Sequence, residues 1–69
     1  MFNKLRSKMV EQSCSTKELA QVLGISQSTL SRRFNGKHTF TIIEVGKCKE
    51  RLALTDTEVS EIFFNVKVS

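Results

Sequence analysis

The chain has 69 residues, 39% of them hydrophobic, and carries a formal net charge of +4 with a sequence pI of about 9.4. This length fits one small domain spanning residues 1–69, with little room for a second domain or for a water-excluding catalytic pocket. No apolar run reaches the ~18 residues that a membrane span needs, and no apolar segment follows the basic N-terminal residues as it would in a signal peptide. We therefore expect a cytoplasmic protein without membrane association.

The positive charge is concentrated in one half of the chain. Residues 1–40 carry seven Lys or Arg against two Glu, whereas residues 41–69 carry four Lys or Arg against five acidic residues. A basic surface attracts phosphate groups. The same pattern is also typical of a solvated basic face, so charge alone does not decide between the two.

Two cysteines, Cys14 and Cys48, and one histidine, His38, are the candidate metal ligands and nucleophiles besides the acidic residues. The cysteines are 34 positions apart without a CxxC pair, and this set is too small for a structural zinc site. We expect two free cysteines in or beside the core, no metal, no cofactor and no small-molecule ligand. Since His38 has no carboxylate or nucleophile near it in sequence, and the chain has no glycine-rich phosphate loop, we do not expect an enzyme.

Residues 2–13 are predicted to form the first helix, because Phe2, Leu5 and Met9 recur at spacings of three and four. The basic residues of this segment fit either a solvated face or phosphate contacts. These residues are Lys4, Arg6 and Lys8.

Residues 16–23 are predicted to form the second helix. Ser15 and Glu18 have the spacing of a capping box, in which each side chain accepts a hydrogen bond from the backbone of the other. Gly24 follows the last apolar position, where a left-handed residue ends a helix without steric cost. The apolar face of this helix consists of Leu19, Ala20 and Leu23.

Residues 27–35 are predicted to form the third helix. Ser26 is a favourable N-cap, and Leu30 and Phe34 give the helix one buried face. The Asn-Gly pair that ends at Gly36 is a helix stop signal.

The block of residues 15–36 resembles the helix-turn-helix of the lambda-repressor/Cro-type (XRE-type) DNA-binding family. The likeness rests on the capping box, on Ala20 where the two helices cross, on Gly24 in the turn with the apolar Ile25 after it, and on the closing Phe-Asn-Gly. It extends more weakly over residues 4–64. It implies an all-α, lambda-repressor-like bundle of five helices, at about residues 2–13, 16–23, 27–35, 41–52 and 56–64.

The loop of residues 36–40 connects the third helix to the fourth. Phe40 is expected to anchor this loop in the core. In the resembling family the loop runs along the DNA backbone, and Lys37 and His38 occupy the positions where such contacts are made.

The fourth helix is predicted over residues 41–52, where Thr41 and Glu44 have the spacing of a second capping box. Gly46 weakens this helix and is compatible with a close approach by a neighbouring helix. The predicted buried stripe consists of Ile42, Val45, Cys48 and Leu52.

The fifth helix is predicted over residues 56–64, after a third capping box formed by Thr55 and Glu58. Its apolar residues are Val59, Ile62 and Phe63.

The tail of residues 65–69 continues an apolar C-terminal segment. Because Phe63 and Phe64 are adjacent, they point to different sides of a helix. Two interpretations stay open: Phe64, Val66 and Val68 form a dimer contact, or the two phenylalanines fold back onto the core of their own chain.

The resemblance implies that the third helix lies in the major groove, with Gln27 and Ser28 facing base edges. Ser31 and Arg32 follow on the same face. Arg32 is the best candidate for a bidentate contact to a guanine, and Gln27 can pair with an adenine. The predicted phosphate contacts are Thr16, Lys17, Arg33, Asn35, Lys37 and His38.

A recognition helix covers only about four or five base pairs, and proteins of the resembling family usually bind a palindrome as dimers. The expectation is therefore a repressor-like transcriptional regulator, resembling a small phage or prophage Cro-type protein, that binds double-stranded DNA as a homodimer. The alternative is a protein-interaction regulator that binds another regulatory protein through the same fold, as an anti-repressor, a co-repressor or an antitoxin does.

Overall fold

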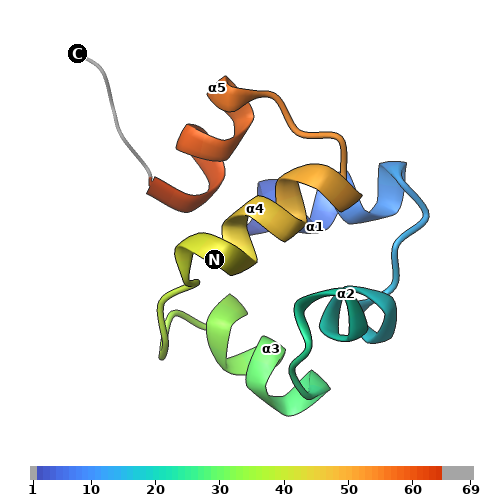
Figure 1. Cartoon of the computed structure of the whole chain (residues 1–69), viewed down its shortest axis with the longest axis vertical. Helices are drawn as coiled ribbons and strands as arrows, with labels where there is room; N and C mark the ends of the chain where they lie inside the picture. The colour runs from blue at the N-terminus through green and yellow to red at the C-terminus, as the bar shows by residue number, and fades with distance from the viewer. Residues whose placement is uncertain (1, 65–69) are drawn as a thin grey trace.

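A computed structural model describes residues 2–64 of the chain. In this range the chain folds into five helices and a final π-helical turn (Figure 1), which confirms the predicted all-α bundle. None of these helices is long and apolar enough to cross a membrane. The elements are α1 (Asn3–Glu11), α2 (Thr16–Leu23), α3 (Gln27–Phe34), α4 (Ile42–Arg51), α5 (Asp56–Val59) and the π-helical turn η1 (Ser60–Phe64).

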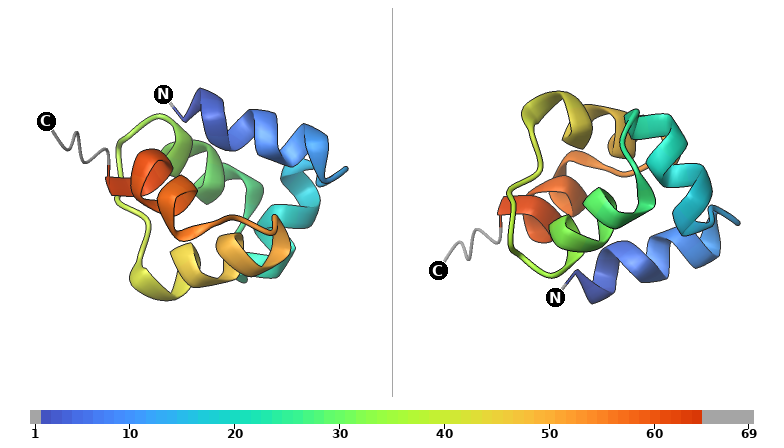
Figure 2. Two further views of the ribbon diagram at one scale, coloured as in Figure 1. Left: turned by 90° about the horizontal axis from the view of Figure 1, so that it is seen from above. Right: turned by 90° about the horizontal axis from the view of Figure 1, so that it is seen from below.

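Helices α1 and α4 lie across the middle of the bundle, with α2 and α3 on one side and α5 on the other (Figures 1 and 2). Helix α2 packs against both α3 and α4. This arrangement leaves one side of α3 without a covering helix (Figure 1).

Helix starts follow the capping signals of the sequence. All three predicted capping boxes form, and in each the N-cap hydroxyl accepts the N3 backbone N–H at 3.1 Å. Ser26 caps α3 in the same way. Helix α1 ends at Glu11, two residues earlier than predicted, because Ser13 adopts a left-handed φ of 51°.

The core lies between the helices and consists of aliphatic, aromatic and sulfur-containing side chains. Both cysteines are buried and free, as expected, and burial raises the pKa of the Cys48 thiol to about 12. Such a thiol is chemically inert at neutral pH. Phe40 is 8% exposed and anchors the loop after α3, as predicted. The side chains with no more than 1% exposure are Leu5, Leu19, Leu30, Cys48 and Leu52.

Aromatic contacts join the two ends of the described chain. Phe2, before α1, and Phe63, in η1, both pack against Phe40, with ring centroids 5.2 and 5.1 Å apart. Both pairs meet edge to face, an arrangement that the quadrupoles of the rings favour. Phe63 therefore packs onto the core of its own chain, which is one of the two interpretations that the sequence left open.

Two details of the α4 prediction are wrong. Ile42 was expected in the buried stripe but is 86% exposed, because the first turn of α4 extends beyond the core and burial starts at Glu44 and Val45. Gly46 does not mark a close approach, since a Cβ atom at this position would meet no atom within 4 Å.

Candidate nucleic-acid interface

Helices α2 and α3 form a helix-turn-helix with a short turn between them. Gly24 ends α2 with a φ of 72°, and the Ile25 backbone N–H donates to the Ala20 carbonyl at 3.0 Å. Ala20 is 2% exposed, so its small side chain permits close packing beneath the turn. These local contacts fix the direction in which α3 leaves α2.

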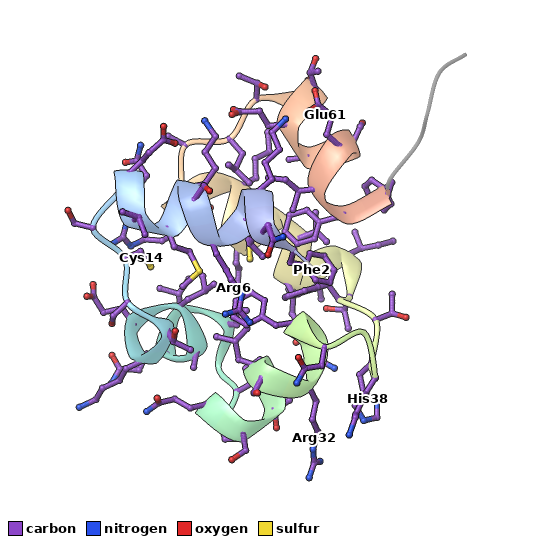
Figure 3. All side chains as sticks on the ribbon, turned by 180° about the vertical axis from the view of Figure 1, so that it is seen from behind. Phe2, Arg6, Cys14, Arg32, His38 and Glu61 are labelled. Atoms are coloured by element: carbon purple, nitrogen blue, oxygen red, sulfur yellow. The ribbon has the colours of Figure 1, made fainter. Side chains whose placement is uncertain are left out.

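The side of α3 that faces away from the core carries the four predicted base-reading residues. Leu30 and Phe34 of the same helix are buried in the core, and Arg32 points away from the bundle (Figure 3). The polar residues are all exposed, and they are Gln27, Ser28, Ser31 and Arg32. The structure therefore brings these four side chains together on one open face.

Thr29, which lies between them in sequence, has a different environment. It is half-buried, and its hydroxyl lies 2.9 Å from the Ser26 hydroxyl, while its backbone N–H donates to the same Ser26 oxygen at 3.1 Å. Thr29 is thus part of the α3 cap.

Most of the predicted phosphate-contacting residues lie at the two ends of the helix-turn-helix. Thr16 and Lys17 are exposed in the first turn of α2. Asn35 is the C-cap of α3, and Lys37 and His38 follow in the loop, all three exposed. His38 points out on the same side of the bundle as Arg32 (Figure 3).

Arg33, the remaining one of the six predicted phosphate contacts, lies in a different environment. Its side chain is 15% exposed, and its Nη2 donates to Oε2 of Glu44 at 2.9 Å. Burial favours the neutral form of Glu44, but the Thr41 backbone N–H and the Arg33 guanidinium outweigh this effect, and the pKa of Glu44 is lowered. A phosphate contact by Arg33 stays a prediction, and it must compete with this ion pair.

Glu44 is the residue that sequence reasoning missed. Its capping role was predicted from the spacing to Thr41, but its second oxygen holds Arg33, which lies eleven residues earlier. Nothing in the local sequence distinguishes an acidic cap with a second partner from one without.

The remaining ion pairs neutralise basic residues outside the helix-turn-helix. Lys4 and Lys8, for which a solvated face and phosphate contact both stayed open, pair with Glu61 and Glu58. Lys49 pairs with Asp56, and Arg51 lies 3.4 Å from Glu18.

Three basic residues in or directly after the helix-turn-helix are left without such partners, unlike Arg33, which pairs with Glu44. Among the ion pairs between residues 2–64, none involves Lys17, Arg32 or Lys37. The positive charge around α3 therefore remains available to an anionic ligand.

The end of the described chain exposes an aromatic side chain beside a groove. Phe64 is 56% exposed. It borders a groove of about 230 Å³ whose other lining residues include Phe2, His38, Phe40 and Phe63. Val66 and Val68, the other predicted dimer residues, lie outside the described range.

Comparison with known proteins agrees with this geometry. A helix-turn-helix family model matches residues 5–61, which include the capping boxes, the turn and all of α3. No curated protein matches the chain. The matched region is most of the chain, so the protein belongs to the XRE-type helix-turn-helix family of DNA-binding regulators.

Proposed function

We propose that the protein is a sequence-specific transcriptional regulator that inserts α3 into the major groove of double-stranded DNA. The observation that carries this proposal is the open polar face of α3, with four exposed polar side chains and with Lys17, Arg32 and Lys37 free of ion pairs within the described chain. The major groove admits one α-helix and presents a distinct pattern of donors and acceptors for each base pair.

The four exposed residues of α3 have different roles in this proposal. Arg32 donates two hydrogen bonds to O6 and N7 of a guanine, a pairing worth about 1–3 kcal/mol of discrimination. Gln27 pairs with an adenine. Ser28 and Ser31, which are short, permit close approach and add single hydrogen bonds.

Phosphate contacts fix the position of the protein along the duplex. In this proposal Thr16 and Lys17 present the N-terminus of α2, with its free backbone N–H groups, to one phosphate. Lys37 and His38 follow the DNA backbone on the other side of α3. Asn35 and Arg33 complete the predicted set, and Arg33 does so only if it leaves Glu44.

A homodimer on a palindromic operator completes the proposed assembly. Two copies place their α3 helices in successive major grooves about 34 Å apart, which lengthens the sequence that is read. Support comes from the exposed Phe64 and the apolar groove beside it. We propose that the protein acts as a repressor, like a small phage or prophage Cro-type regulator, at the DNA in the cytoplasm.

Selection of bound sequences from a random duplex pool tests the function directly. We expect the wild-type protein to enrich a palindrome, and Arg32→Ala to lose its preference at one guanine in each half-site. Ser60→Ala, which changes an exposed residue of η1 on the far side of the bundle, is the matched control and should enrich the wild-type sequence. Enrichment of no sequence by the wild-type protein contradicts the proposal.

A second candidate function is binding to another regulatory protein. It is favoured by three exposed apolar side chains near the start of α4 and the end of η1, namely Ile42, Ile43 and Phe64. Under this alternative, substitution of these residues abolishes regulation while the α3 face is dispensable. Purified protein that binds a specific duplex without a partner decides in favour of the DNA-binding function.

A further inference from the structure

We propose that Arg33 and Glu44 form a brace that positions the loop of residues 35–41 relative to α3, so that Arg33 acts on sequence discrimination through Glu44 without contacting DNA. This inference rests on the proposed DNA-binding function. It assigns Arg33 a positioning role in place of the predicted phosphate contact.

The first observation is the environment of Glu44. Among residues 2–64 it is the one buried charged side chain, at 6% exposure. Oε1 accepts the Thr41 backbone N–H at 2.9 Å, and Oε2 accepts Arg33 Nη2 at 2.9 Å. One carboxylate therefore closes the cap of α4 and holds the end of α3 at the same time.

The second observation is the environment of Arg33. Its Nε is buried and has no hydrogen-bond partner within the described structure. Burying a donor without an acceptor is unfavourable, so the contact with Glu44 must compensate for it. If Arg33 swung out to a phosphate, Glu44 would be left as a buried, unpaired carboxylate, which is strongly unfavourable.

The third observation is what lies between the two partners. The loop between Arg33 and Glu44 contains Lys37 and His38, the proposed phosphate contacts. The Lys37 backbone N–H donates to the Arg32 carbonyl at 3.0 Å at the start of the loop. Phe40 anchors the far end in the core. The ion pair is the polar side-chain link between the ends of this loop, beside the apolar contact of the Phe34 and Phe40 rings, whose centroids lie 6.3 Å apart.

These observations give the brace a specific consequence. If the ion pair is removed, the Phe34–Phe40 contact remains, but Lys37 and His38 lose the polar link that holds them in register with Arg32. Phosphate contacts then form without the alignment that base contacts need. Binding to a specific duplex weakens more than binding to an arbitrary one.

The experiment is a double-mutant cycle with Arg33→Gln, Glu44→Gln and the double variant. Glutamine in place of Glu44 retains an oxygen that can accept the Thr41 N–H, so the cap is kept and only the ion pair is lost. Glu58→Gln is the matched control, because it likewise keeps a capping box and removes an ion pair, the one with Lys8, on the opposite side of the bundle. Arg33→Lys keeps a positive charge at this position and is expected to retain the discrimination that Arg33→Gln loses.

Affinities are measured for the selected operator and for a scrambled duplex over a series of salt concentrations, below the unfolding transition of every variant. We expect each single variant to reduce the ratio of specific to nonspecific affinity by about tenfold, and the double variant to be no worse than either. The salt slope should stay that of the wild type. In the free protein, amide exchange should accelerate in the loop of residues 35–41 in both single variants but not in Glu58→Gln.

Three results would overturn the brace. The first concerns the slope of log K against log[salt]. If Arg33→Gln reduces the magnitude of this slope by about 0.9, both in the wild-type background and in the Glu44→Gln background, Arg33 is a phosphate ligand. Additive losses in the double variant, or discrimination equal to that of the wild type in all variants, show that the two residues do not act together. A wild-type protein that binds both duplexes equally contradicts the proposed function itself, and that outcome is visible before any variant is compared.

Discussion

The guanidinium carbon of Arg6 in α1 lies 4.8 Å from the centroid of the Phe34 ring in α3. Arg6 thereby covers the one aromatic residue that α3 contributes to the core. A cation over an aromatic face is worth about 0.5–1 kcal/mol at an exposed site, and the aliphatic stem of the arginine adds packing.

Arg6→Ala should therefore lower the free energy of unfolding by about 1 kcal/mol, which is a drop of several degrees in Tm for a domain of this size. Thermal unfolding followed by circular dichroism measures the change. Arg6→Lys retains a cation and should lose less. If the alanine variant unfolds at the wild-type temperature, the contact does not contribute to stability.

The Lys8–Glu58 ion pair predicts a pH dependence. The Lys8 ammonium group and the Thr55 backbone N–H together lower the pKa of Glu58 to about 2, from an ordinary value of 4.5. Because the pKa is lowered in the folded state, the stabilisation is fully present above pH 4.5 and is lost as the pH falls towards 2.

Glu58→Gln should accordingly unfold at a lower temperature than the wild type at about pH 7, and the difference should shrink to nothing near the lowered pKa of about 2. Glu50→Gln is the control, since Glu50 takes part in none of the ion pairs formed among residues 2–64. A difference between Glu58→Gln and wild type that is independent of pH would contradict the assignment of the shift to this carboxylate.

Two glycines in different backbone environments should respond in opposite ways to alanine. Gly24 has a φ of 72° in the turn between α2 and α3, so Gly24→Ala should destabilise the protein by about 1 kcal/mol. Gly46 lies inside α4 with no atom within 4 Å of an added Cβ, so Gly46→Ala should stabilise it by up to about 1 kcal/mol. Urea unfolding of both variants measures the two changes in the free energy of unfolding. Changes of the same sign in both variants would contradict this prediction.

The proposed dimer is tested through Phe64. A polar residue at this position, combined with removal of residues 65–69, should reduce the mass in sedimentation equilibrium to that of one chain. Val10→Ser is the control, because Val10 is also an exposed apolar residue, at 81%, but lies in α1 and is not one of the residues that line the groove beside Phe64. An unchanged mass in the Phe64 variant would remove this surface from the dimer proposal.

Local features of the fold could be predicted from the sequence because their partners are close in the chain. Each capping box joins residues three positions apart, and Gly24 ends α2 through its own backbone freedom. The common face of Gln27, Ser28, Ser31 and Arg32 follows from the period of a helix in the same way. The exposure of these four side chains could therefore be predicted from the sequence.

Other features depend on contacts between distant segments and could not be predicted. Ile42 matches the apolar spacing of α4, but whether its turn reaches the core depends on where the loop before it places the helix. Arg33 and Glu44 belong to different helices, and the sequence does not indicate which acidic residue Arg33 pairs with. The environment of Arg33 was missed for this reason.

The central claim, that Arg32 on α3 reads a base, is tested most directly by a cycle that changes both partners. Wild-type and Arg32→Ala proteins are titrated with the selected operator and with the same duplex after replacement of the guanine assigned to Arg32. We predict that the base change weakens wild-type binding by about 1–3 kcal/mol and leaves Arg32→Ala nearly unaffected. Equal weakening of both proteins would show that Arg32 does not read that base.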